Sequence, residues 1–311
     1  MKIVFLGTPL FASIILKKIN SNYSISLVVS KADSPVGRKK ILTPSPVKEE
    51  ALRLGIKVIT PDKVKEIITD LDLIKPDILI TAAYGKMIPD DILDKYFTIN
   101  LHASLLPKYR GGSPIEYALL NGDPITGITI MRLVKKMDAG PILYQEAIDI
   151  LASENKTELT LRLANKAAEM IIKYLANINC FKEVKQDETK ATYAYNMGYS
   201  SQILDLMQNV EVVNNKIRAL SLTPGAFIKV SNTLVKIIKA DTTKIKSSPY
   251  HIKVNKDELL IGTRDYYLRV LFLQQAGKKE MLVKDYLNGQ KLFIDNNYID
   301  NYLKEYQESN G

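Results

Sequence analysis

The first half of the chain alternates between two hydrophobic patterns, and this alternation limits the folds that the chain can adopt. Short, continuous apolar runs are typical of strands buried on both faces, and they are separated by stretches with apolar residues at helical spacing. Alternating strands and helices favour an α/β fold, with a largely parallel sheet and helices on both faces. The apolar runs lie at residues 2–6, 26–30, 57–60, 77–84 and 98–102, and the helical stretches near residues 10–19, 46–54, 62–71 and 90–95.

The character of the sequence changes after residues 155–178, which predict a long amphipathic helix. A polar segment follows, and beyond it come short strand-like runs separated by turns, which are typical of a small antiparallel barrel or sandwich. We therefore expect a first domain at residues 1–185, a linker at 186–206 and a smaller second domain at 207–311.

The chain is basic: 43 Lys and Arg residues against 34 Asp and Glu residues give a formal net charge of +9. A basic balance favours an anionic partner, and nucleic acid is the first candidate. A genome that favours lysine codons is an equally good explanation, so the charge alone does not decide between the two.

Cys180 is the only cysteine in the sequence. This excludes an internal disulfide bond and a cysteine-based zinc cluster, and it favours a reducing cytosol. No run approaches the ~18 apolar residues that a membrane span needs. Gly7, Thr8 and Pro9 interrupt the apolar N-terminus, which argues against a signal peptide. We expect a cytoplasmic protein without a membrane partner.

Asn100 and His102 stand at the end of the predicted strand 98–102, directly before a loop that contains Pro107. Because side chains alternate along a strand, both point to the same face, at the carboxyl end where α/β sheets bind ligands. The amide donates hydrogen bonds, and the imidazole changes charge near neutral pH. Together they can hold an oxygen that becomes negative. Taken alone, His102 is better explained as a hydrogen-bonded histidine at a strand end.

Asp138 lies in a short turn between two predicted strands, residues 126–134 and 141–150. A carboxylate in this turn has no packing role, and beside His102 it could fix the orientation of the imidazole. By itself, Asp138 is more simply explained as a residue that shapes the turn.

Residues 31–48 form a basic loop, punctuated by Gly and Pro, that includes Arg38, Lys39 and Lys40. Such a loop can enter a groove of a nucleic acid or follow its phosphates. A solvated charged loop explains the composition equally well. The sequence contains no P-loop, no GxSxG motif and no His or Cys residues at metal-binding spacing, and GTPLF after the first strand is not GxGxxG.

Taken together, these motifs resemble a known family. The run NLHASLLPKYRGGSP, followed by TGITIM and MDAGPIL, is similar to the 10-formyltetrahydrofolate-dependent formyltransferases. Four further features are similar to the branch of that family that formylates methionyl-tRNA: GTPLFA, GRKKILTPSPVK, AAYGKMIP, and IRALSLTPGAFIKV with QQAGKKEM. The likeness extends over nearly the whole chain.

The resemblance implies a Rossmann-like catalytic domain with a mostly parallel sheet, followed by a smaller OB-like β-barrel domain that binds tRNA. It implies that 10-formyltetrahydrofolate donates a formyl group without a metal, and that initiator methionyl-tRNA accepts it for translation initiation. No stable protein partner is expected. The implied site residues are Asn100, His102 and Asp138 for catalysis, Ser104, Leu105, Leu106, Pro107, Tyr84 and Gly85 for folate binding, and Arg38, Lys39 and Lys40 for tRNA binding.

The sequence departs from the family pattern at some positions. Leu10 stands where an acidic residue is usual, Ala139 where Thr is common, and the chain has no Trp. Two alternatives stay open. One is another folate-dependent enzyme of the superfamily, which formylates a sugar-nucleotide amine or a purine precursor or releases formate. The other is a non-catalytic RNA-binding protein on an enzyme scaffold. The basic loop disfavours the first, and the three implied catalytic residues disfavour the second.

Overall fold

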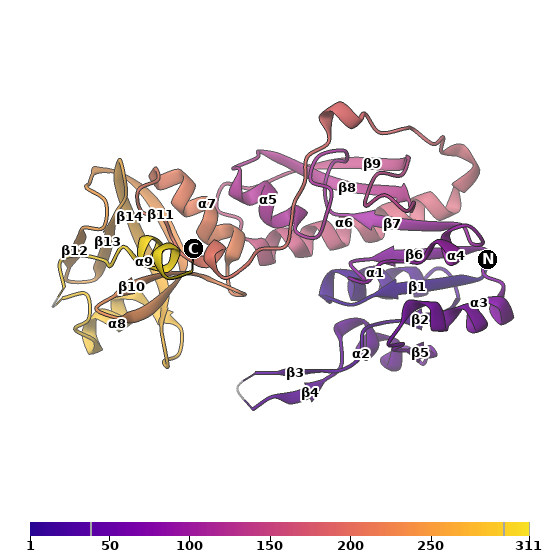
Figure 1. Cartoon of the computed structure of the whole chain (residues 1–311), viewed down its shortest axis with the longest axis horizontal. Helices are drawn as coiled ribbons and strands as arrows, with labels where there is room; N and C mark the ends of the chain where they lie inside the picture. The colour runs from indigo at the N-terminus through magenta and orange to yellow at the C-terminus, as the bar shows by residue number, and fades with distance from the viewer. Residues whose placement is uncertain (38, 295, 311) are drawn as a thin grey trace. The chain divides into compact units, whose positions relative to one another are not determined.

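The computed structural model describes every residue of the chain except 38, 295 and 311 (Figure 1). The chain divides into two compact units. The first comprises Met1–Pro114, Ile125–Asp149 and Leu159–Tyr195, and the second comprises Ile115–Pro124, Ile150–Glu158 and Asn196–Gly311. Two short segments between residues 115 and 158 thus belong to the second unit. The predicted boundaries of the linker, at residues 186 and 206, stay predictions.

The first unit is built on a seven-stranded sheet with the strand order β5-β2-β1-β6-β7-β8-β9. The first five strands in this order, β5, β2, β1, β6 and β7, pair in parallel. Strands β8 and β9 extend the sheet in antiparallel fashion. The predicted α/β fold with a mostly parallel sheet is therefore confirmed. The strands are β1 (Ile3–Gly7), β2 (Ile25–Val29), β5 (Val58–Ile59), β6 (Ile78–Ala82), β7 (Thr98–His102), β8 (Ile125–Arg132) and β9 (Ile142–Asp149).

Helices follow the strands at the predicted places, and α2 shows how the sequence starts one. Ser45 Oγ accepts a hydrogen bond from the backbone N–H of Lys48 at 3.1 Å, and Pro46 occupies the first helical position, where no N–H is needed. The helices of this half of the chain are α1 (Leu10–Asn20), α2 (Pro46–Arg53), the 3₁₀ helix η1 (Val64–Ile67), α3 (Ile68–Ile74), α4 (Asp90–Leu93), α5 (Pro114–Leu120) and α6 (Lys156–Ala176).

The strand order reverses next to β1. In α/β sheets, ligands bind at the carboxyl ends of the strands beside such a reversal. The chain passes from β1 to β2 and β5 on one side and returns to β6 on the other. At such a point the connections leave the carboxyl ends of adjacent strands in opposite directions, which opens a crevice. Here Thr8 Oγ1 donates a hydrogen bond to the carbonyl of Tyr84 at 2.9 Å and joins the segments that follow β1 and β6.

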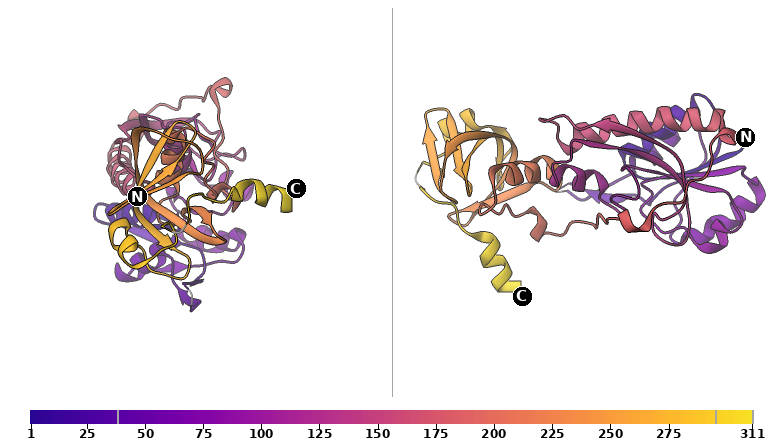
Figure 2. Two further views of the ribbon diagram at one scale, coloured as in Figure 1. Left: turned by 90° about the vertical axis from the view of Figure 1, so that its left-hand side faces the viewer. Right: turned by 90° about the horizontal axis from the view of Figure 1, so that it is seen from above.

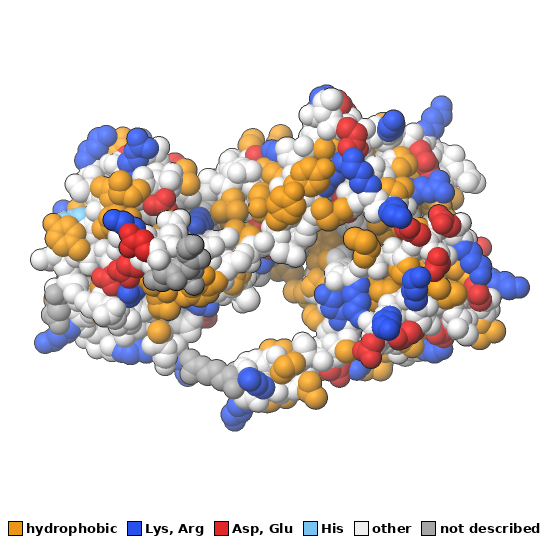
Figure 3. All heavy atoms as spheres, in the orientation of Figure 1, with side chains coloured by type: hydrophobic (Ala, Val, Ile, Leu, Met, Phe, Trp, Pro, Cys, Tyr) orange, Lys and Arg blue, Asp and Glu red, His pale blue; other side chains and the backbone are white. Residues whose placement is uncertain are grey.

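The basic loop contains a hairpin that the sequence did not predict. β3 (Ser34–Val36) and β4 (Ile41–Thr43) form a separate two-stranded antiparallel sheet. The space-filling view shows apolar and basic side chains along this hairpin (Figure 3). Because neither face of the hairpin is covered by a core, its strands leave no alternation of buried and exposed residues in the sequence.

The second unit contains an antiparallel sheet with the strand order β10-β11-β14-β13-β12, and β15 pairs with β14. Helix α7 packs on this sheet, since its Val213 and Ile217 share an apolar cluster with Ile237 and Leu268. The elements of the unit are α7 (Val210–Leu220), β10 (Ala226–Val230), β11 (Thr233–Lys246), β12 (Ile252–Asn255), β13 (Glu258–Gly262), β14 (Tyr266–Gln275), β15 (Met281–Leu282), α8 (Val283–Gly289) and α9 (Tyr302–Asn310).

Residues 297–300 connect the two edges of this sheet. On the β12 side, the N–H of Ile252 donates to the carbonyl of Asn297 at 2.8 Å, and on the β10 side, the N–H of Asp300 donates to the carbonyl of Lys229 at 2.9 Å. This segment closes the sheet into a barrel-like form, and helix α9 extends from it in both views of Figure 2. The predicted smaller antiparallel β domain is confirmed.

Candidate active site

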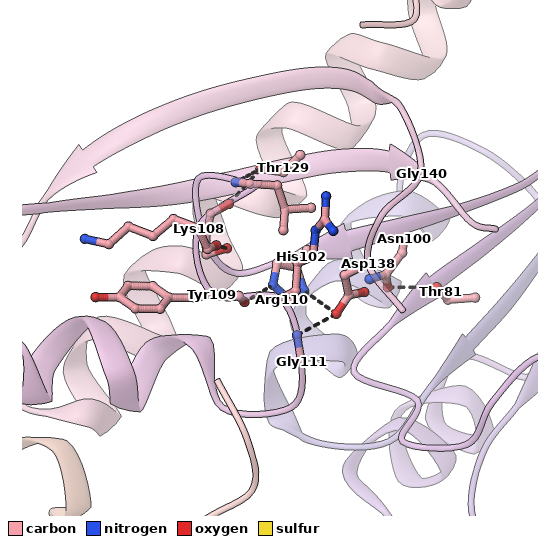
Figure 4. A network of polar contacts seen from close by, with 12 residues as sticks. Thr81, Asn100, His102, Lys108, Tyr109, Arg110, Gly111, Thr129, Asp138 and Gly140 are labelled. Atoms are coloured by element: carbon pink, nitrogen blue, oxygen red, sulfur yellow. Dashed lines mark hydrogen bonds and ion pairs between the residues drawn. The ribbon is translucent and has the colours of Figure 1, made fainter. Parts of the chain in front are cut away.

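Strand β7 presents Asn100 at the carboxyl edge of the sheet, where Thr81 of the neighbouring strand orients it. The Thr81 hydroxyl donates a hydrogen bond to Asn100 Oδ1 at 2.8 Å (Figure 4). Since the amide oxygen is engaged, the Nδ2 group remains as a donor, and no hydrogen bond to another described residue engages it. The neighbouring strand thus orients the Asn100 amide and leaves its Nδ2 available as a donor.

His102 is nearly buried, with 6% of its surface exposed. Its Nε2 lies 2.8 Å from the carbonyl oxygen of Tyr109. A carbonyl only accepts hydrogen bonds, so Nε2 carries a proton and the ring is oriented by the loop that follows it. The other nitrogen, Nδ1, faces Asp138 Oδ2 at 3.7 Å, which is too long for a hydrogen bond but close enough for an ion pair.

Asp138 reaches this position through an unusual backbone conformation. Its φ of 46° lies in the left-handed region, which non-glycine residues adopt only where the surroundings hold them. The Gln186 amide provides that hold, because Nε2 donates to the carbonyls of Asp138 at 2.8 Å and of Gly140 at 2.7 Å. The N–H of Gly111 donates to Asp138 Oδ2 at 2.8 Å and fixes the carboxylate (Figure 4). The structure thus brings the three predicted residues together.

Arg110 ties the motif loop to the segment that follows α6. Its guanidinium is fully buried and donates to Gln186 Oε1 at 2.8 and 3.1 Å and to the Glu188 carboxylate at 2.9 and 3.1 Å. Hydrogen bonds from Arg110 and then from Lys136 lower the pKa of the Glu188 carboxyl to about 2. Arg110 and Asp138 therefore share Gln186 as a common support.

The Ser104–Pro107 segment is held by a buried threonine of β8. The Thr129 hydroxyl donates to the Ser104 carbonyl at 2.6 Å and accepts from the Leu106 N–H at 3.1 Å. Gln145 of β9 adds bonds to Thr129 Oγ1 at 2.7 Å and to the Leu106 carbonyl at 3.0 Å. Ser104 and Leu106 are buried, whereas Leu105 and Pro107 are half-buried and offer apolar surface.

Tyr84 and Gly85 follow β6 on the same edge of the sheet. The Tyr84 side chain points into an apolar cluster with Val4 and Leu71, and burial raises the pKa of its hydroxyl. Only backbone groups of these two residues can therefore face the crevice. Gly85 has a φ of +73°, a backbone conformation that residues with a side chain rarely adopt, so a substitution there would be strained.

The three residues predicted to bind tRNA lie apart from this network. Lys39 and Lys40 are exposed in the turn between β3 and β4. Arg38 lies outside the described residues. The hairpin forms its own small sheet. The hydrogen bonds and the ion pair that hold the trio predicted to be catalytic, Asn100, His102 and Asp138, come from other segments of the described chain.

Several residues of the site were not predicted from the sequence. Thr81 could have been noticed, because it is a hydroxyl inside an otherwise apolar strand. Arg110 stands in the NLHASLLPKYRGGSP run, but nothing there indicates that it is buried. Nothing in the sequence indicates that Gln186 and Gln145 support the site, since glutamine is common in polar segments and on strand faces. Their roles depend on contacts across the fold.

Within the part of the chain that the structure describes, no three or more His, Cys, Asp or Glu side chains are grouped so that they could hold a metal ion. None of the helices among the described residues has the length and apolar character that a membrane span requires.

An amide donor, an imidazole and a carboxylate meet at the carboxyl edge of a mostly parallel sheet, beside a Ser-Leu-Leu-Pro loop; these are the features of the formyltransferase class of enzymes. The chain belongs to the formyl transferase family. The family profile described as "Formyl transferase" matches residues 1–175, and the profile "Formyl transferase, C-terminal domain" matches residues 196–291.

Curated relatives match almost the whole chain. The methionyl-tRNA formyltransferase of Caldicellulosiruptor saccharolyticus is 38% identical over 304 residues, which cover 94% of this chain and 98% of that protein. The methionyl-tRNA formyltransferase of Bacillus subtilis is 40% identical over 301 residues, which cover 93% and 94%.

Solved structures show the same fold at low sequence identity. The N-formyltransferase from Helicobacter canadensis, solved with folinic acid and dTDP-3-aminofucose, has a TM-score of 0.68 at 19% identity over 87% of this chain and 98% of that one. HypX from Aquifex aeolicus, solved with tetrahydrofolic acid, has a TM-score of 0.65 at 19% identity over 92% and 47%.

Proposed function

We propose that this chain transfers the formyl group of 10-formyltetrahydrofolate to the α-amino group of methionine esterified to initiator tRNA. The reaction would take place in the cytoplasm, at translation initiation. The observation that carries the proposal is the joint placement of Asn100, His102 and Asp138. The full-length likeness to enzymes named methionyl-tRNA formyltransferase supports the choice of acceptor.

The reaction forms a bond between the amine nitrogen and the formyl carbon and breaks the bond from that carbon to N10 of the folate. An α-amine has a pKa near 7.7–8.0, so about a tenth of it is already neutral at pH 7. A strong base is therefore not required. The harder demands are orientation, which can supply roughly 7–11 kcal/mol, and stabilisation of the formyl oxygen.

The hydrogen bonds of the trio suggest a role for each residue. Asn100 Nδ2 donates to the formyl oxygen as negative charge develops, because its own oxygen is engaged by Thr81. His102 turns Nδ1 toward the same space, since Nε2 donates to the Tyr109 carbonyl. It donates from Nδ1 to the formyl oxygen as the imidazolium, in which both ring nitrogens carry a proton. Asp138 takes the proton that the amine loses, and this proton finally reaches N10. Asp138 Oδ2, 3.7 Å from Nδ1, also holds His102 by charge.

The folate would lie against the segment from Ser104 to Pro107 and the backbone of Tyr84 and Gly85. This environment fits a flat, polar ring system, since half-buried Leu105 and Pro107 supply apolar contact and the main chain of Gly85 can supply hydrogen bonds. 10-Formyltetrahydrofolate would supply the activated formyl group. The chain's own residues would position the two reactants.

The tRNA would bind through the hairpin β3–β4 and through residues 207–311, which hold 16 Lys and Arg residues against 11 Asp and Glu residues. Lys39 and Lys40 are exposed at the hairpin turn, and the apolar side chains beside them, Val36, Ile41 and Leu42, are 54–70% exposed. A net charge of +9 favours such an anionic partner. The segment 1–185 would be the catalytic domain, 186–206 the linker and 207–311 the tRNA-binding domain.

The proposal is tested by measuring formyl transfer from 10-formyltetrahydrofolate to three acceptors: methionyl-tRNA, free methionine and a sugar-nucleotide amine. We expect rapid transfer to methionyl-tRNA only. Transfer mainly to the sugar-nucleotide amine would instead assign the chain to that branch of the superfamily. The absence of transfer to all three, with tRNA binding intact, would favour the RNA-binding alternative.

A further inference from the structure

Tyr193 and Tyr195 form a stacked aromatic pair that the roles proposed for the other residues do not use. Their ring centroids are 5.9 Å apart, and the ring planes differ by 8°. Yet Tyr193 is 40% exposed and Tyr195 is 62% exposed. Large aromatic side chains left in water on a polar segment have no packing role, and they are the side chains on which nucleic-acid bases stack.

The pair is fixed beside the catalytic loop by the residue between its two members. Ala194 is fully buried; its N–H donates to the Arg110 carbonyl at 2.8 Å, and its carbonyl accepts from Ser113 at 3.1 Å. Hydrogen bonds to Glu188 and to Tyr193 raise the pKa of the Arg110 guanidinium. The aromatic pair is therefore held to the same loop that holds the catalytic trio.

Gly111 lies between the segment that carries the two tyrosines and Asp138. A Cβ at Gly111 would lie 2.7 Å from the Ala194 carbonyl oxygen, so the two backbones are in direct contact there. The N–H of the same glycine donates to Asp138 Oδ2 at 2.8 Å. One glycine thus separates the catalytic carboxylate from the segment that carries the tyrosines.

We infer that Tyr193 and Tyr195 form a stacking platform for the unpaired bases at the 3′ end of the aminoacylated tRNA. This inference rests on the proposed function, since the amino acid whose amine enters the site is esterified to the terminal ribose. When the amine lies between Asn100 and Asp138, the terminal nucleotides must lie beside the site. A base adds to the exposed ring of Tyr195, which is stacked on Tyr193. Stacking tolerates any base, so the platform positions the acceptor end without reading its sequence.

The first test is kinetic. Tyr195→Ala should raise KM for methionyl-tRNA about tenfold, which corresponds to the loss of one base stack, and leave KM for 10-formyltetrahydrofolate unchanged. Tyr195→Phe keeps the ring and should restore KM to within about twofold of the wild-type value, as stacking requires. An unchanged KM in Tyr195→Ala, in a preparation whose wild type formylates methionyl-tRNA, overturns the platform and leaves the proposed function intact. A wild type without that activity overturns both.

The second test uses the absence of Trp from the sequence. Tyr195→Trp introduces a single indole, and its fluorescence should be quenched by tRNA with an intact 3′ end but not by tRNA trimmed of its terminal nucleotides. The matched control is Tyr23→Trp, which lies before β2 at the amino edge of the sheet and should respond to neither RNA. Equal quenching of Tyr195→Trp by intact and trimmed tRNA at saturation overturns the inference.

Discussion

Two segments of the first unit, the motif loop at 100–111 and the hairpin at 34–43, are built in opposite ways. In the motif loop, Ser104 and Arg110 are fully buried, His102 is 6% exposed, and these polar side chains are all hydrogen-bonded. In the hairpin, by contrast, even the apolar Leu42 is 70% exposed. Many buried contacts fix the conformation of the motif loop. The hairpin, by contrast, depends on a few hydrogen bonds between its own two strands.

The two segments are therefore suited to different tasks. A group that must meet a reacting atom needs a position fixed to a fraction of an ångström, and a satisfied buried network supplies it. A surface that meets a long, charged and deformable partner needs charge and freedom to adapt. Substitutions in the motif loop should therefore change kcat or stability, and substitutions in the hairpin should change KM and its salt dependence.

The largest effect is expected in the trio. His102→Ala should lower kcat by at least about 100-fold, the scale of losing one donor to a developing oxyanion. Asn100→Ala should lower it by at least about the same factor, for the same reason. Asp138→Ala should lower it by at least about 100-fold as well, because the group that takes up the amine proton is lost. The measurement is steady-state formyl transfer to methionyl-tRNA, with thermal unfolding to show that each variant folds.

The matched control is the only other histidine in the sequence, His251. It lies in the second unit, with Nδ1 2.7 Å from the Tyr267 hydroxyl, so His251→Ala should leave kcat within about twofold if catalysis depends on the trio alone. A near-normal rate for any trio variant would remove that residue from the proposed mechanism.

The second effect is on stability. Thr129→Val keeps the shape of the side chain but leaves the Leu106 N–H and the Ser104 carbonyl without their partner. Because both groups are buried, the free energy of unfolding should fall by about 1–3 kcal/mol. In the hairpin, Thr43→Val removes only a bond from the hydroxyl to the Ile41 carbonyl and should change stability by less than ~0.5 kcal/mol. Urea denaturation of both variants tests the comparison, and equal losses would contradict it.

The third effect concerns the salt dependence of tRNA binding. Lys39→Ala and Lys40→Ala should each raise KM for methionyl-tRNA a few-fold and lower the slope of log KM against log salt by about 0.9 for each phosphate that the variant no longer neutralises. Unfolding and KM for 10-formyltetrahydrofolate should not change. Lys18→Ala, at the exposed end of α1, is the control and should leave the slope as it is. A parallel loss of folate binding would show that the hairpin does not act on tRNA.

The sequence predicted the parts of the molecule whose signal is local. Buried strands such as 98–102 and the capped helix at Pro46 follow from apolar runs and a serine, and both are present as expected. The alternation of side chains along β7 correctly placed Asn100 and His102 on one edge of the sheet.

The supports of the site could not be predicted, because they join residues far apart in the chain. Gln186 holds the carbonyl of Asp138 across 48 positions, and Thr129 holds Leu106 across 23. The tautomer of His102 depends on the backbone carbonyl of Tyr109, and since every residue has such a carbonyl, the sequence does not indicate which one His102 contacts. Hydropathy also failed for the hairpin, since it packs on no core and its strands show no pattern of burial.

The smallest effect lies where the motif loop meets solvent, at Glu188. Arg110 and Lys136 lower the pKa of this carboxyl to about 2 in the folded protein, well below its value near 4.3 in an unfolded chain. A lowered folded-state pKa means that the ionised group stabilises the fold above pH ~4.3 and that this contribution is lost as the pH falls toward 2. Since the Glu188 side chain is 48% exposed, solvent screens its ion pair with Arg110, and the loss of stability at low pH is modest.

Thermal unfolding measured at pH 4.5, 3.5 and 2.5 should therefore show a shallower fall of Tm in Glu188→Gln than in the wild type. Glu169→Gln, on the exposed face of α6, should fall as the wild type does. If both variants follow the wild-type slope, the guanidinium of Arg110 is held by Gln186 and burial alone, and the motif loop does not depend on charge at its exposed end.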